Sequence, residues 1–171
     1  LISSKDLKEI TNLYEEYWKI YTRSLTLPPQ YISSESIIEK SIIGEGTTIY
    51  GQIYNSVIGC GVTVGAGTVI RDSIIMNEAV IGDGCEINKG IIAENVLIGN
   101  SVRLGIGEEV PNETHPHIYS HGMVTVGEKS VIPEGVTVGK NTVIAGVTNY
   151  DDYTDKSLAG GKTLIKAGDE S

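Results

Sequence analysis

The sequence lacks the features that mark several classes of protein. It contains no Phe, one Trp, two Met and two Cys among 171 residues. Cys60 and Cys85 show no paired metal-ligand spacing, and one possible bridge is not a disulfide framework, so we expect a reducing, cytoplasmic setting. No apolar run approaches the roughly 18 residues of a membrane span, and no basic segment followed by an apolar one marks a leader.

Basic residues are also scarce. The chain has 13 Lys and Arg against 22 Asp and Glu, a formal net charge of −9, which repels phosphate backbones and anionic membrane surfaces. We therefore expect neither nucleic acid nor a membrane as a partner. The chain opens on Leu1 and its first residues read as the middle of a longer sequence, so we expect one domain cut from a larger protein.

The sequence is rich in Gly, with 21 residues, and its apolar residues are mainly Val and Ile, which favours extended chain with many turns. From Ile58 to Leu104 an aliphatic residue followed by a small or polar one recurs every five or six residues, and three consecutive intervals always sum to 17; after an interruption the repeat resumes from Val126 to Ile144 at intervals of six. This period arranges the aliphatics in three columns: Ile58, Ile75 and Ile92; Val64, Ile81 and Ile98; and Ile70, Ile87 and Leu104.

A 17-residue period with three columns predicts a three-sided coil whose short strands pair with those of the turns above and below. The aliphatics point to the axis, and a second inward position two residues earlier is small or medium, as at Ser56 and Cys85. The Gly that often follows an aliphatic suits a corner that turns tightly or has positive φ. Because prisms of hexads coil left-handed, the predicted fold is all-β: a single-stranded left-handed parallel β-helix over residues 32–148, with an irregular first turn.

Two flanking segments do not follow the repeat. Residues 1–31 are predicted to form a short helix and an interdomain connector, because apolar residues recur at helical spacing in 3–17 and Pro28-Pro29 forces extended chain. Residues 149–171 are polar and are predicted to cap the last turn or to hang free. The apolar positions of the predicted helix are Leu7, Ile10, Leu13, Tyr14 and Tyr17.

An insertion at residues 105–122 interrupts the repeat and is predicted to leave the coil as a loop at one corner. It contains all three histidines, His115, His117 and His121. One of them could serve as a catalytic base, or two could bind a metal; exposed loop histidines are the alternative, because no carboxylate or Cys stands at ligand spacing. We predict no catalytic and no metal-binding residue in this chain.

The stretch from Asn12 to Ile32 contains Trp-Lys-Ile-Tyr-Thr followed by Leu-Pro-Pro. It closely resembles the passage between the two domains of glucose-1-phosphate adenylyltransferases. The segments from Asp72 to Met76 and from His121 to Pro133 also look like turns of that family's β-helix. The resemblance covers residues 5–147.

The resemblance implies that this chain is the oligomerisation and regulatory domain of an enzyme of glycogen biosynthesis, which makes ADP-glucose and pyrophosphate from ATP and glucose 1-phosphate. ATP and Mg²⁺ would bind to a catalytic domain absent from this chain; the chain itself would need no cofactor and be inactive alone. The implied partners are that N-terminal domain and further copies in a homo-oligomer, a tetramer in the family. An anionic effector would be bound by Arg23, Lys89 and Lys129, although plain solvent-exposed lysines are the alternative.

Three other functions remain open at this point, because coils of hexads occur in several kinds of enzyme. One is a stand-alone hexapeptide acyltransferase with His117 or His121 as the base. A second is a regulatory paralogue of the adenylyltransferase that has lost catalysis, and a third is a guanylyltransferase or uridylyltransferase. Coenzyme A binding would distinguish the first, and the upstream sequence would distinguish the other two.

Overall fold

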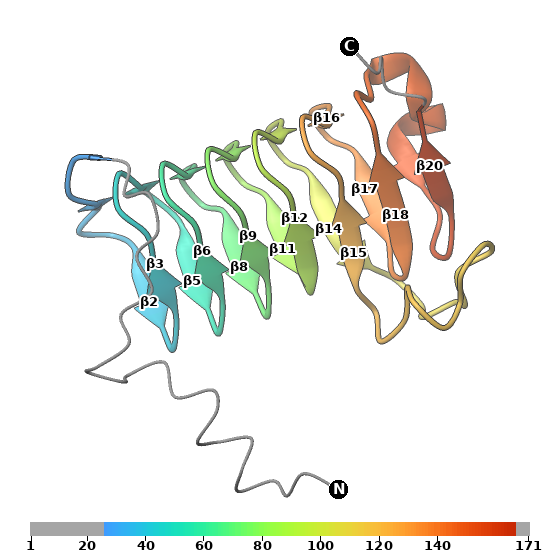
Figure 1. The fold of residues 1–171 in the computed structure, drawn as a ribbon, viewed down its shortest axis with the longest axis horizontal. Coiled ribbons are helices and arrows are strands. Elements are labelled where there is room, and N and C mark those ends of the chain that lie inside the picture. Colours follow the sequence, from blue (N-terminus) through green and yellow to red (C-terminus); the bar gives the residue numbers. More distant parts are fainter. Residues whose placement is uncertain (1–25, 167–171) are drawn as a thin grey trace, which may run out of the picture.

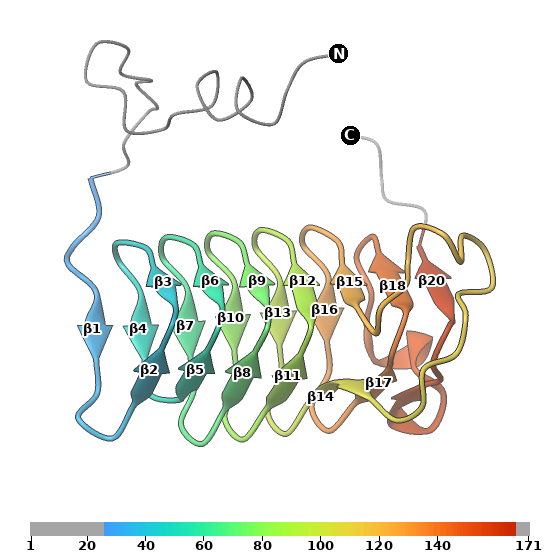
Figure 2. The same cartoon turned by 90° about the horizontal axis from the view of Figure 1, so that it is seen from below.

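The computed structural model describes residues 26–166, which form a three-sided parallel β-helix (Figures 1 and 2). Each turn contributes one short strand to each of three sheets. Helical structure in the described part of the chain is limited to two 3-10 turns, η1 (Tyr150–Asp152) and η2 (Thr154–Lys156). The all-β class and the coil of hexads are confirmed, whereas the predicted helix at 3–17 lies outside the described residues.

The strands stack in register along the coil. Sheet A contains β1 (Tyr31–Ile32), β4 (Thr48–Ile49), β7 (Thr63–Val64), β10 (Val80–Ile81), β13 (Leu97–Ile98) and β16 (Val131–Ile132). Sheet B contains β2 (Ile37–Glu39), β5 (Gln52–Tyr54), β8 (Val69–Arg71), β11 (Glu86–Asn88), β14 (Arg103–Ile106), β17 (Thr137–Gly139) and β19 (Ser157–Leu158). Sheet C contains β3 (Ile42–Ile43), β6 (Val57–Ile58), β9 (Ile74–Ile75), β12 (Gly90–Ile92), β15 (Val124–Val126), β18 (Thr142–Ala145) and β20 (Thr163–Ile165).

The core is the stack of inward aliphatics that the period predicts. Ile75 pairs with Ile58 on one side and with Ile92 on the other, and all three side chains are buried. The smaller inward positions are buried as well. Among them, the Cys85 thiol contacts the Gly99 carbonyl at 3.1 Å, and its burial raises its pKa, so it behaves as a small core residue rather than a reactive thiolate.

Most glycines that follow the inward aliphatics, such as Gly65 and Gly82, are required by close packing and not by positive φ, which corrects one of the two reasons expected for them; Gly105, with φ of +74°, is an exception. Gly65 and Gly82 are absent from the positive-φ residues. A Cβ on Gly82 would lie 2.8 Å from the carbonyl carbon of Gly99 in the next turn, closer than any side chain tolerates. The left-handed corner falls two residues further on, as at Gly67 and Gly84.

The coil also extends past the predicted limit at residue 148. Strands β19 and β20 pair with β17 and β18, so most of the described tail forms a further partial turn. In sheet A the place of a seventh strand is taken by η1 and η2 (Figure 2). The first turn is irregular as expected, because Ile43 pairs with Ile58 only 15 residues later.

A candidate effector site at the edge between sheets B and C

The chain passes from sheet B to sheet C through a single residue in the left-handed conformation. These residues include Asn55, Asp72 and Lys89, with φ of 47°, 50° and 52°. Each is exposed, because this conformation turns the chain sharply and leaves the side chain outside the prism. In the turns before the insertion, the edge therefore carries one polar side chain per turn, and Asn55 donates to Asp72 across 2.6 Å.

The insertion leaves and rejoins the coil at this same edge, between β14 and β15. Two buried asparagines fix it there. Asn112 donates to the Asn141 carbonyl at 2.9 Å and accepts from the backbone N–H of His115 at 2.9 Å. Asn141 donates to the Val110 carbonyl at 2.9 Å and accepts from the Gly122 N–H at 2.8 Å. The loop is thus held over the last turns by side-chain amides that satisfy its backbone.

An ion pair adds to this attachment. Lys162 contacts Glu113 at 2.8 Å, and the same carboxylate accepts from the Thr163 N–H at 3.0 Å. These bonds, with Lys162 foremost, lower the pKa of Glu113. The loop and the partial last turn therefore form one bonded unit.

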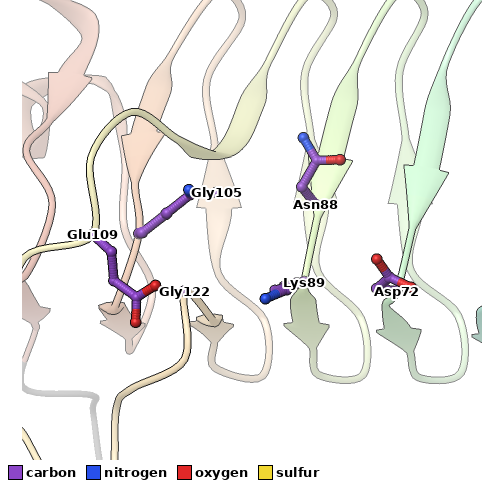
Figure 3. A pocket seen from close by; sticks show the side chains of 7 residues that line it. Asp72, Asn88, Lys89, Gly105, Glu109 and Gly122 are labelled. Carbon is purple, nitrogen blue, oxygen red and sulfur yellow. The ribbon is translucent and has the colours of Figure 1, made fainter.

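Two adjacent hollows lie where the loop meets the edge, and Asp72 and Lys89 line both of them. The first, of about 230 Å³, is shown in Figure 3, and the second measures about 300 Å³. Besides the shared pair, the first hollow is lined by Asn88, Gly105, Glu109, Gly122 and Lys140. The second is lined by Ile74, Gly90, Ile91, His121 and Met123.

Charged side chains of both signs converge on Gly122. A Cβ at that position would lie 3.5 Å from the Lys140 stem, 3.7 Å from the Lys89 stem and 3.8 Å from a carboxylate oxygen of Glu109. The Lys89 ammonium donates to the His121 carbonyl at 3.1 Å. Neither Lys89 nor Lys140 has a carboxylate within salt-bridge distance among residues 26–166, so both ammonium groups are available to an anion.

The structure places the predicted effector residues at different locations. Lys89 lines both hollows. Lys129 lies at another edge of the prism, between β15 of sheet C and β16 of sheet A, and contacts Glu128 at 3.5 Å. Arg23 lies outside the described residues. The structure thus does not bring Lys89 and Lys129 together.

Sequence reasoning missed Lys140 and Glu109, which line the first hollow with Lys89. A signal for Lys140 was present, because it directly follows β17 just as Lys89 directly follows β11, and both strands belong to sheet B. The insertion at residues 105–122 lies between these two lysines and interrupts the 17-residue period, so the period does not show that they occupy equivalent positions. Glu109 carried no such signal, because the path of an irregular loop is not periodic.

The three histidines are exposed. His115 stacks edge-on against Tyr119 with ring centroids 6.2 Å apart. His121 lines the second hollow. Within the described range no imidazole forms an ion pair or a hydrogen bond with a carboxylate, so nothing there orients a catalytic base.

The described residues also contain no group of three His, Cys, Asp or Glu side chains arranged to hold a metal ion. Over the same residues, no helix has the length and apolar character needed to cross a membrane.

Repeated hexads, three parallel sheets and an aliphatic axis define this chain as a hexapeptide-repeat β-helix domain. The family described as "GlmU-like, C-terminal hexapeptide" matches residues 29–126. The chain belongs to that family.

Curated relatives extend the similarity well beyond the hexads. The chain is 58% identical over 164 residues to a glucose-1-phosphate adenylyltransferase of Lachnospira eligens, covering 96% of this chain and 39% of the relative. It is 43% identical over 158 residues to the enzyme of the same name from Acetivibrio thermocellus, covering 92% and 37%. For the Thermotoga maritima enzyme the identity is 44% over 154 residues, covering 90% and 36%. The chain thus spans well under half the length of these relatives.

Solved structures are less similar. The acetyltransferase domain of PglB from Neisseria gonorrhoeae is 20% identical with a TM-score of 0.36, covering 77% of this chain and 55% of that one. The GDP-perosamine N-acetyltransferase of Caulobacter crescentus is 15% identical with a TM-score of 0.29, covering 82% and 54%.

Proposed function

We propose that this chain is the C-terminal β-helix of a glucose-1-phosphate adenylyltransferase, which makes ADP-glucose and pyrophosphate from ATP and glucose 1-phosphate for glycogen biosynthesis in the cytoplasm. The observation that carries the proposal is the 58% identity to the Lachnospira eligens enzyme over 96% of the chain. A match of that extent includes the connector, the insertion and the tail. Hexads alone would support several unrelated enzymes.

The chemistry would take place in an N-terminal nucleotidyltransferase domain, which would bind ATP and Mg²⁺. The described part of the coil offers no set of side chains for a metal, and its interior is filled by aliphatic groups. Its role would be to join the subunits of a homo-oligomer, a tetramer by analogy with the family, and to transmit the binding of effectors.

An anionic effector would bind in the hollow beside Lys89. Two ammonium groups line it that have no carboxylate partner among residues 26–166, and phosphate and carboxylate groups bind to such sites through charge-assisted hydrogen bonds. Glu109 and Asp72 lie in the same hollow and would favour a ligand that also carries hydroxyl groups, as a sugar phosphate does. Arg23 would contribute from the connector, while Lys129 at the other edge would need a separate contact.

An assay of the full-length protein tests the enzymatic proposal. We expect pyrophosphate release that requires ATP, Mg²⁺ and glucose 1-phosphate together, and no such activity from the 171-residue chain alone. Assays of this chain with acetyl-CoA and amine or sugar acceptors form the second arm. Acyl transfer by the chain, lost on His117→Ala or His121→Ala, would instead establish an acyltransferase.

The effector proposal has its own test in the full-length enzyme. Lys89→Gln should raise the concentration of inorganic phosphate or of a sugar phosphate needed for half-maximal regulation about tenfold, the loss of one charge-assisted hydrogen bond. Lys40→Gln is the matched control, because Lys40 is a left-handed lysine (φ 49°) at the same edge but does not line the hollow. Equal responses of the two variants would remove Lys89 from the effector site.

A further inference from the structure

The first hollow is shared between the coil and the insertion. Lys89 follows β11 and Lys140 follows β17, and the insertion leaves the coil after β14, which lies between these two strands in sheet B. Glu109 and Gly122 of the insertion line the hollow together with both lysines. Figure 3 shows that Glu109 and Lys89 come from different segments of the chain. The hollow therefore has all of its walls only while the insertion is docked on the coil.

A second part of the insertion is bonded to the last turn. The Glu113 N–H donates to the Gly161 carbonyl at 2.8 Å, and the Glu113 carboxylate accepts from the Thr163 N–H at 3.0 Å. The side-chain amide of Asn112 donates to the Thr163 hydroxyl at 3.2 Å. Thr163 begins β20 and lines neither hollow. The insertion thus contacts the hollow with one part and the last turn with another.

A ligand in the hollow would contact the coil and the insertion together. The stems of Lys140 and Lys89 lie 3.5 Å and 3.7 Å from the position of a Cβ on Gly122, so the docked insertion brings both cationic side chains to one point. A phosphate group accepts charge-assisted hydrogen bonds from such ammonium groups, and the Glu109 carboxylate accepts from hydroxyl groups. A ligand that needs all of these groups binds the docked state more tightly and, by linkage, stabilises it.

We propose that the insertion, residues 105–122, transmits ligand binding in the first hollow to the last turn of the coil. A sugar phosphate binds Lys89 and Lys140 through its phosphate group and Glu109 through its hydroxyl groups, which ties the insertion to the coil. The docked insertion in turn holds β20 through its bonds to Thr163. This coupling rests on the effector site proposed above but not on the reaction proposed for the full-length protein.

Amide hydrogen exchange of the 171-residue chain tests the coupling, with glucose 1-phosphate as the probe and chloride at the same ionic strength as the reference. Calorimetry first gives the dissociation constant. At ten times that concentration, exchange should slow about tenfold in residues 107–122 and also in β19 and β20, because the ligand must leave before the insertion is released. Exchange in β5 to β11 should not change. Lys140→Gln should weaken binding about tenfold and remove the protection at the same ligand concentration.

A pair of double variants separates binding from transmission. Glu113→Ala with Thr163→Val removes the carboxylate and the hydroxyl through which the insertion holds β20. Glu108→Ala with Thr125→Val is the matched control, because Glu108 is exposed in the same insertion, Thr125 lies in the same outward column of sheet C as Thr163, and neither lines a hollow. At ten times each variant's own dissociation constant, both should keep the protection of the insertion, and only the control should keep that of β20.

Three results would overturn the proposal in different ways. Absence of binding, or protection that persists in Lys140→Gln, would remove the effector site together with the coupling. Binding that protects the insertion but not β20 in the unmodified chain would leave the effector site and remove the coupling. Equal protection of β20 in the two double variants would assign transmission to the coil itself, through the Gly161 N–H that donates to the Lys140 carbonyl at 2.8 Å.

Discussion

Ile32 and Ile132 occupy the two ends of one column in sheet A, yet Ile32 is 43% exposed and Ile132 is fully buried. Beyond the Ile132 end, Thr148 donates its hydroxyl hydrogen to the Val131 carbonyl at 3.0 Å. Because that hydrogen is used, the bond at 3.1 Å between Thr148 and Tyr153 must be donated by the phenol. Tyr153 is therefore linked through Thr148 to the last strand of sheet A, and it belongs to the same core cluster as Ile132.

The inward column predicts the response to a charge on the axis. Ile81→Asp should unfold the chain, with a loss of more than about 4 kcal/mol, because a carboxylate at this 1% exposed position would have no partner. Val80→Asp is the control on the adjacent residue of β10, whose side chain is 41% exposed on the outer face. Circular dichroism and thermal melting should show a folded protein for Val80→Asp alone. A folded Ile81→Asp variant would show that the assigned inward face is wrong.

Two neighbouring glycines should differ in their tolerance of a methyl group. A Cβ on Gly65 would lie 2.5 Å from the carbonyl carbon of Gly82 in the next turn, so Gly65→Ala should force the turns apart and cost about 2–3 kcal/mol. Gly67 has φ of +69° but no atom nearer than 3.9 Å, so Gly67→Ala should cost only about 1 kcal/mol of backbone strain. Urea unfolding of both variants measures the two costs, and the opposite order would contradict the close-packing explanation.

The insertion should be released by removing one amide. Asn112→Ala takes away the donor to the Asn141 carbonyl and the acceptor for the His115 N–H, so we expect a loss of about 2–3 kcal/mol in the attachment of the loop. Hydrogen exchange of residues 107–122 should accelerate while that of β5 to β11 stays unchanged. His117→Ala, an exposed change in the same loop, should alter neither. Unchanged exchange in Asn112→Ala would show that other contacts hold the loop.

Tyr153 should make stability fall at alkaline pH. Burial raises the pKa of its phenol above the ordinary value, so the folded protein keeps the group neutral while the unfolded chain ionises above about pH 10. Its contribution is complete below that pH and is lost as the pH rises through the folded pKa. Tyr153→Phe should cost about 1 kcal/mol at pH 7, for the lost bond to Thr148. The difference between wild type and Tyr153→Phe in urea unfolding should shrink toward pH 11, and a constant difference would refute the assignment.

Much of the fold could be predicted because it is periodic. An aliphatic such as Ile75 meets identical neighbours every 17 residues, so the spacing alone identifies the inward face and its partners. The candidate site could be predicted only in part. Lys89 stands in the periodic part, whereas Glu109 reaches the hollow through a loop whose path the period does not describe.

The sequence by itself determined the three columns and the register of the strands, because each depends on contacts repeated at a constant interval. Contacts that occur at only one place in the fold, and are not repeated from turn to turn, were decided by the tertiary structure alone. It placed Lys140 beside Lys89, put Lys129 on another edge and bonded Asn112 to Thr163, 51 residues away, at 3.2 Å. In the tertiary structure the tail forms β19 and β20, and Tyr153 is hydrogen-bonded to Thr148. Such contacts depend on where a particular loop and the last turn meet in space, which no local pattern of residues encodes.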